Sequence, residues 1–208
     1  MRLAIFGASG GTGQELLQQA LARGDEIRAL VRNPAKLTIK SNRLHVVPGD
    51  ILDKTAVSTT LEGCEAALST LGVNKLGKNT ILSDGTRNII EAMQAQQVKR
   101  FICLTSLGVG DSFNDVWWGF RWVTWTLMRN IFRDKEIQEQ LVKHSSLDWI
   151  IVRPSHLVNG SRTGKYSVWL GQKPAGLRDR IRRADVADFM LAQTQIDHYL
   201  RKTPGISS

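Results

Sequence analysis

The sequence predicts an α/β protein with a doubly wound parallel sheet of about six to seven strands. Two observations lead to this fold class. Short apolar runs alternate with amphipathic helical segments along the whole chain, which is the pattern of a parallel sheet covered by helices on both faces. In addition, the first thirty residues read as strand, glycine-rich turn, helix and strand, which is a right-handed crossover unit.

The elements follow one another in a regular order. Strands are predicted at 3–6, 27–31, 44–47, 66–71, 101–104 and 149–152, with helices from Gly13 to Gly24, after Asp53, over 80–96 and over 185–194. Each strand is a short apolar run, and Gly24 is a typical helix stop. Because no repeat, low-complexity tract or linker interrupts the series, residues 1–208 are expected to form a single domain.

The composition excludes several classes of protein. The 208 residues are 42% hydrophobic and 23% charged, which is typical of a globular chain. Cys64 and Cys103 lie in apolar runs without a C-x-x-C pattern, so we expect buried thiols, a reducing compartment and no metal site. The first predicted strand begins within two residues of Met1, which leaves no signal peptide, and no apolar run approaches the ~18 residues of a membrane span. A cytoplasmic protein is expected, a monomer rather than an oligomer.

The positive charge indicates an anionic ligand without naming it. The chain carries a formal net charge of +9, and residues 161–183 contribute +6 of it, including Arg183. This segment is either a solvated basic face or a mouth that attracts phosphates or carboxylates. No nucleic-acid recognition motif accompanies the charge, so nucleic acid is not an expected partner.

The glycines of the first turn predict a dinucleotide site. Gly7, Gly10 and Gly13 stand three apart between a buried strand and a helix. In such a loop the first glycine permits the tight turn, the second lets a pyrophosphate approach the backbone, and the third packs the helix on the strand. The N–H groups of the helix N-terminus then bind phosphate. This arrangement is that of a Rossmann fold.

The end of the second strand favours NADPH over NADH. An NAD enzyme places a carboxylate there for the ribose 2′-hydroxyl, whereas this chain has Arg32 followed by Lys36. A guanidinium can stack on adenine and bind a 2′-phosphate with two hydrogen bonds.

Motifs in order along the chain carry a family resemblance. They are residues 7–13, Val31-Arg32, Gly49-Asp50-Ile51, Leu71-Gly72, residues 83–89, Thr105-Ser106 and Pro154-Ser155-His156. The sequence resembles the atypical short-chain dehydrogenases/reductases, which are NAD(P)H-binding, NmrA-like proteins, and within them the flavin and biliverdin-IXβ reductases. Arg153 and Ser155 depart from the pattern of those reductases.

The resemblance implies roles for individual residues. The cofactor phosphates would be held by Gly7, Ser9, Gly10, Gly11, Thr12, Gly13 and Arg32, while Asp50 and Ile51 flank the adenine and Leu71 and Gly72 touch the sugar. Thr105, Pro154 and Ser155 would surround the nicotinamide. From the sequence alone, Asp50 could equally cap a turn before the next helix.

The catalytic pair of ordinary short-chain dehydrogenases is absent. Those enzymes place a Lys four residues after a Tyr, but Tyr166 is followed at that distance by Leu170 and Tyr199 by Thr203. Without a phenol to protonate an alkoxide, hydride transfer to a conjugated acceptor such as a flavin or a bilin is favoured. Ser106 and His156 are the candidate catalytic side chains, and neither is expected to be indispensable, because solvent can protonate a reduced flavin.

Four of the six tryptophans fall within residues 117–125, and a helix would place Trp118 and Trp122 on one face. These side chains form either a core contact, a stacking wall for a planar substrate, or a surface for a partner or membrane. With Arg183, they are the candidate substrate-binding residues in a pocket built by the C-terminal third.

The expected function is an NADPH-dependent reductase of flavins and linear tetrapyrroles. The alternatives are a non-catalytic NADP(H)-sensing regulator and an assembly factor of NmrA-like type.

Overall fold

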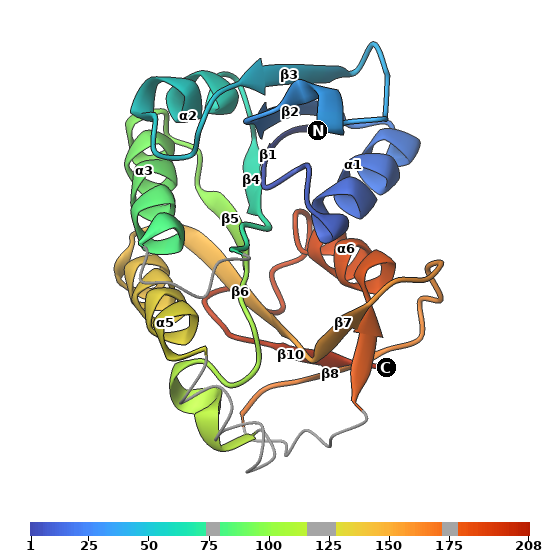
Figure 1. The fold of residues 1–208 in the computed structure, drawn as a ribbon, viewed down its shortest axis with the longest axis vertical. Coiled ribbons are helices and arrows are strands. Elements are labelled where there is room, and N and C mark those ends of the chain that lie inside the picture. Colours follow the sequence, from blue (N-terminus) through green and yellow to red (C-terminus); the bar gives the residue numbers. More distant parts are fainter. Residues whose placement is uncertain (74–79, 116–127, 172–178) are drawn as a thin grey trace.

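Eight strands form the central sheet of the protein in the computed structural model, which describes residues 1–73, 80–115, 128–171 and 179–208 (Figure 1). The strands stand in the order β3-β2-β1-β4-β5-β6-β10-β8. Their bounds are β1 Arg2–Phe6, β2 Glu26–Val31, β3 Leu44–Pro48, β4 Ala66–Ser69, β5 Arg100–Leu104, β6 Asp148–Pro154, β8 Ser167–Trp169 and β10 Gly205–Ser207. A separate parallel pair is formed by β7 His156–Val158 and β9 Arg180–Arg182.

The predicted doubly wound parallel sheet is confirmed. Strands β1 to β6 are parallel throughout, and the order reverses between β1 and β4. The expected number of strands was slightly too low, because β10 adds to β6 in parallel and β8 pairs antiparallel with β10. Each of these two strands has only three residues, too few for a hydrophobic pattern to predict.

Two layers of helices cover the sheet. The α-helices are α1 Gly11–Arg23, α2 Lys54–Leu61, α3 Ile81–Ala95, α5 Arg129–His144 and α6 Arg183–Ala192, and short 3₁₀ helices span Pro34–Lys36 and Gly110–Asp115. Leu3 and Ile5 of β1 pack in the core beneath α1 and α6, whereas Ala4 and Phe6 face the core beneath α2 and α3. Figure 1 shows the two layers on opposite sides of the strands. Alternate residues of β1 therefore pack into two hydrophobic cores, one on each face of the sheet.

The observed helix boundaries lie close to those predicted from the sequence. Gly24 ends α1 in the left-handed conformation (φ +93°), and its N–H bonds to carbonyls of the last turn. The Asp53 carboxylate accepts the N–H groups of Thr55 and Ala56 at the start of α2. The last helix begins two residues earlier than predicted, at Arg183, and β4 ends at Ser69 rather than at Leu71.

Helix α5 has no counterpart among the predicted elements, and its buried face mixes the apolar Ile131 and Val142 with polar residues. Asp134, Gln138 and Glu139 are all less than 4% exposed. The Asp134 carboxylate accepts the backbone N–H groups of Leu82 and Ser83 at the N-terminus of α3. This side chain therefore acts as the cap of a neighbouring helix.

Within the described residues, no helix is both long and apolar enough to cross a bilayer. The segment 117–125, with Trp118 and Trp122, lies outside the described residues.

Candidate functional site at the carboxyl edge of the sheet

The turn after β1 requires two of its glycines for packing. Gly7 has φ +83°, and a Cβ there would lie 2.7 Å from the carbonyl carbon and oxygen of Thr70 at the end of β4. A Cβ on Gly13 would lie 2.2 Å from the Gly7 oxygen. Neither neighbour can yield, because both are backbone. The turn is thereby clamped between β4 and α1, as the predicted roles of the first and third glycines require.

The N-terminus of α1 presents free donors at this turn. Its first hydrogen bond runs from the Gln14 N–H to the Gly10 oxygen at 2.9 Å, and in the described part of the chain no acceptor meets the N–H groups of Gly11, Thr12 and Gly13. The first turn of α1 holds no acidic residue, and Gly10 offers no side-chain cap. Unpaired N–H groups together with the positive end of the helix dipole suit a phosphate group. The loop residues thus fit a dinucleotide pyrophosphate.

Arg32 follows β2 at the same edge and is open to a ligand. Its side chain is 75% exposed, and its nearest acidic partner is Asp50 at 3.9 Å. Lys36 ends the short helix that follows and is also exposed. A guanidinium this loosely paired is available to a 2′-phosphate.

Asp50 caps a turn, one of the two roles that the sequence left open. One carboxylate oxygen accepts the Leu52 N–H at 2.9 Å, while the following helix is capped by Asp53 instead. The side chain of Ile51 is buried against Gly85, where a Cβ would approach it to 2.6 Å, and the Asn88 amide holds the Ile51 oxygen at 3.0 Å. Gly85 and Asn88 therefore fix the loop that follows β3.

Leu71 and Gly72 follow β4 beside the glycine turn. The Leu71 nitrogen lies 3.0 Å from the position of a Cβ on Gly7, and Leu71 packs on the core. Gly72 is exposed and has nothing within 4 Å of its Cβ position among the described residues. Both residues therefore lie at the point where the strand order reverses, the usual ligand site of such sheets.

A buried ion pair between Arg153 of β6 and Glu139 of α5 lies beside Thr105, the residue that follows β5. Arg153 donates to both oxygens of Glu139, at 3.0 and 2.5 Å, and to Asp111 at 2.5 Å. The Thr105 hydroxyl donates to the same Glu139 carboxylate at 2.8 Å. Burial alone would lower the pKa of Arg153, but its bonds to Glu139 and Asp111 outweigh burial and raise it. The guanidinium thus stays charged and anchors Glu139, which in turn accepts the Thr105 hydroxyl.

Lys135 also reaches this edge, and sequence reasoning missed it. Its ammonium donates to the Thr105 carbonyl at 2.9 Å, and burial lowers the pKa of Lys135. In a Tyr-x-x-x-Lys arrangement the phenol would occupy position 131, where the chain has the buried Ile131. Lys135 and Glu139 stand four residues apart, so a helix would place both on one face. This spacing was the sequence signal that could have indicated both residues as candidates.

The two tyrosines serve packing elsewhere. The Tyr166 hydroxyl donates to Asp188 at 3.2 Å, and burial followed by the Asp188 charge raises the pKa of Tyr166 to about 12. Tyr199 packs against Phe189. Neither phenol is placed as a general acid at the carboxyl edge.

Ser106 and His156 stand at the ends of adjacent strands. The Ser106 hydroxyl bonds to the Leu107 oxygen at 3.0 Å, and His156 is exposed at the start of β7 beside Arg180. The Pro154 oxygen accepts the Leu107 N–H at 3.1 Å, which ties the two strand ends together. The Ser155 hydroxyl, in contrast, bonds to Ser207 of β10 and is engaged in the sheet.

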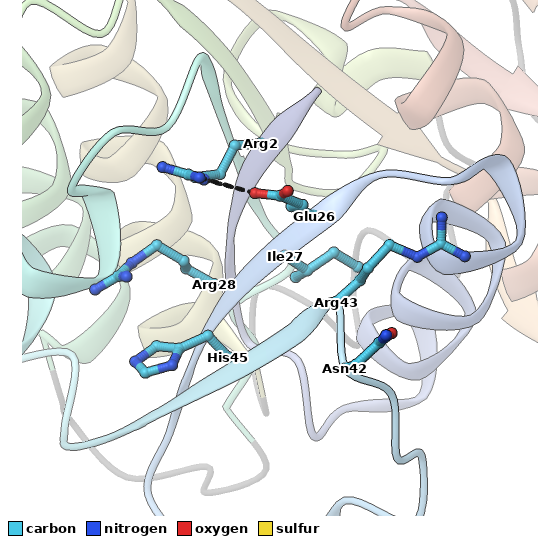
Figure 2. Close-up of a pocket in the computed structure, with 7 residues that line it drawn as sticks. All are labelled: Arg2, Glu26, Ile27, Arg28, Asn42, Arg43 and His45. Carbon is cyan, nitrogen blue, oxygen red and sulfur yellow. Dashed lines mark hydrogen bonds and ion pairs between the residues drawn. The ribbon is translucent and has the colours of Figure 1, made fainter.

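A polar cavity of about 260 Å³ lies at the opposite, amino edge of the sheet (Figure 2). It is lined by Arg2, Glu26, Ile27, Arg28, Asn42, Arg43 and His45. Arg2 and Arg28 are paired with Glu26 and Glu62. This cavity is separate from the glycine turn, which lies at the other end of the same strands.

Among the described residues, no cluster of His, Cys, Asp and Glu could hold a metal ion.

The fold and the glycine turn define a dinucleotide-binding protein of the Rossmann type. Residues 7–197 match the model of a family described as NAD(P)H-binding. The chain belongs to this NAD(P)H-binding family, in the oxidoreductase superfamily, and the short-chain dehydrogenase/reductase resemblance is thereby confirmed.

Similar proteins differ in what is known of them. The solved structure of ChuY from Escherichia coli O157:H7, described as an anaerobilin reductase, superposes with a TM-score of 0.83 at 26% identity, covering 99% of this chain and 96% of that one. The UPF0659 protein YMR090W of Saccharomyces cerevisiae is 25% identical over 201 residues, which is 92% of this chain and 86% of that protein. The photosystem II assembly factor Ycf39 of Trieres chinensis is 31% identical over 118 residues, which is 55% of this chain and 37% of that protein. The chain thus matches well under half of that factor's length.

Proposed function

We propose that the protein is an NADPH-dependent reductase that transfers a hydride to flavins (FMN, FAD and riboflavin) and to linear tetrapyrroles such as biliverdin. The observation that carries the proposal is the position of Lys135. It reaches the end of β5, yet Ile131 stands where a phenol would protonate an alkoxide. A conjugated ring system spreads the incoming negative charge and does not need such an acid. The likeness to ChuY supports a bilin as one acceptor.

The cofactor would bind along the carboxyl edge. The free N–H groups of α1 hold its pyrophosphate, and Arg32 with Lys36 holds the 2′-phosphate, which makes NADPH the preferred cofactor. Bound NADPH supplies the hydride. Thr105 and Lys135 form the wall beside the nicotinamide, and the Arg153–Glu139 pair keeps that wall rigid.

The acceptor would lie over the ends of β5 and β6, in a pocket formed by the C-terminal third. Ser106 and His156 orient the acceptor or a water molecule there, and solvent delivers the final proton. Trp118 and Trp122 remain our proposed stacking contacts. In this arrangement the protein contributes binding and orientation, and the cofactor contributes the chemistry.

The test compares acceptors of different chemistry. Purified protein is mixed with NADPH and, in turn, FMN, biliverdin and a simple aldehyde, and the nicotinamide absorbance is followed. We expect oxidation with FMN or biliverdin and none above background with the aldehyde. Reduction of the aldehyde, or no oxidation with any flavin or bilin, would refute the proposal.

The similarity to Ycf39 favours a second candidate, an assembly factor or NADP(H)-sensing regulator in which the nicotinamide is not consumed. In that case the dinucleotide would change the affinity for a protein partner. A partner captured by affinity purification whose binding follows the ratio of NADPH to NADP⁺, from a protein that reduces no acceptor, would support this candidate.

A further inference from the structure

Gly11 is the one glycine of the turn that the three-glycine pattern leaves unexplained. Its φ lies outside the left-handed region, and it is the first residue of α1, a position that any side chain can occupy. A Cβ on Gly11 would lie 2.8 Å from both the Cδ and the Nε of Arg183. The side chain of Arg183 therefore fills the space that a larger residue at position 11 would take.

Arg183 belongs to the C-terminal part of the chain but lies beside the glycine turn that follows β1. It is the first residue of α6 and directly follows β9. Within the parts of the chain that the structure describes, its guanidinium has one hydrogen bond, from Nη1 to the Asn159 side-chain oxygen at 2.8 Å. A guanidinium carries five N–H donors, so most of them remain for a ligand.

Among the residues that the structure describes, none supplies a counterion to the charge of Arg183. The N-terminus of α1 is itself the positive end of a helix dipole, and its first turn has no acidic residue. The carboxylates near α6 are engaged, Asp185 by Thr163 and Gly164, and Asp188 by Arg162 and Tyr166. Asn159 is neutral. Two positive groups held side by side in this way are complementary to an anion.

We propose that Arg183 binds the pyrophosphate of the dinucleotide and that Gly11 is a glycine in order to admit its side chain. The C-terminal β9–α6 segment then completes the phosphate site that the first turn begins. This changes the expected ligand of Arg183 from the acceptor to the cofactor. The proposal rests on the dinucleotide site of the proposed function and is independent of the acceptor.

Dinucleotide affinity in the absence of any acceptor tests the proposal. The dissociation constants of NADPH and NADH are measured by nicotinamide fluorescence for the wild type and for Arg183→Ala. Loss of a charged hydrogen-bond partner weakens binding roughly tenfold or more, and by the same factor for both dinucleotides because both carry the pyrophosphate. The matched control is Arg182→Ala, since Arg182 bonds to the Ser161 oxygen and should change affinity by no more than about twofold.

A double-mutant cycle tests the role of Gly11. Ala suits the first turn of a helix, so Gly11→Ala should fold, as its thermal midpoint would verify, while it displaces the Arg183 side chain. We expect Gly11→Ala to weaken NADPH binding in the wild type and to add little in the Arg183→Ala background.

Two results would overturn the proposal. One is an Arg183→Ala variant that binds both dinucleotides as tightly as Arg182→Ala does. The other is a Gly11→Ala effect of equal size in both backgrounds, which would mean that Gly11 contacts the cofactor directly. If Arg183→Ala loses affinity but the wild type reduces neither flavin nor bilin, this inference stands and the reductase proposal fails.

Discussion

Replacement of Glu139 by Gln probes the buried ion pair beside Thr105, in the wall that we propose for the nicotinamide. The Glu139 and Arg153 side chains are 2% and 4% exposed, and Glu139 accepts three hydrogen bonds, two from Arg153 and one from Thr105. Removing one partner of such a pair costs about 3–5 kcal/mol, because it leaves a charge in a poorly solvated place. Asp111 remains bonded to Arg153, so we expect the lower end, about 3 kcal/mol.

Thermal unfolding measures the effect. In a chain of 208 residues, a loss of this size lowers Tm by roughly 6–12 °C. The same substitution at Glu91 is the matched control, because the Lys54–Glu91 pair is 71% and 49% exposed and should contribute at most about 1 kcal/mol. Equal shifts in Tm for Glu139→Gln and Glu91→Gln would refute the reasoning, since burial would then make no difference to the pair.

Three further predictions concern the cofactor, the catalytic candidates and pH. Arg32→Gln should weaken NADPH binding roughly tenfold and leave NADH binding unchanged, as paired titrations would reveal, whereas an equal loss for both cofactors would place Arg32 away from the 2′-phosphate. Ser106→Ala and His156→Ala should each lower kcat/KM by less than about tenfold in steady-state assays, because loss of a true general acid costs about 10²–10⁴-fold. The hydrogen bond from Arg153 lowers the pKa of Asp111 to about 2, so the stabilisation by Asp111 is complete above its unfolded pKa of ~4 and disappears as pH falls toward 2. The difference in Tm between the wild type and Asp111→Asn should shrink over that range, and a difference that persists at the acid end would contradict this assignment.

The parallel strands and the glycine turn could be predicted because each is encoded locally. Strands β1, β4, β5 and β6 are apolar runs with almost all residues buried on both faces of the sheet, so each run alone indicates a strand of a parallel sheet. Gly7 and Gly13 are required by backbone contacts that recur wherever a strand, a tight turn and a helix meet in this way. Because the glycine turn follows the first strand, the carboxyl edge of the sheet could be predicted as the cofactor site.

Helix α5 and its contribution to the site could not be predicted in the same way. Its inner face carries Asp134, Gln138 and Glu139, whose partners lie on α3, directly after β5 and on β6. The polar residues between Ile131 and Val142 are buried through specific hydrogen bonds, which a hydrophobic pattern does not show. Lys135 was missed because the helix that carries it was not predicted. The position of Arg183 at Gly11 likewise depends on how β9 and α6 pack, which no local pattern contains.

Rapid mixing of NADPH-loaded protein with biliverdin tests the central claim most directly. The nicotinamide band and the bilin band are followed together under anaerobic conditions. A reductase predicts that both bands fall with one rate constant, which saturates with bilin concentration. A bilin band that stays constant while NADPH remains bound and unoxidised, with FMN giving the same result, would contradict hydride transfer and favour the NADP(H)-sensing role.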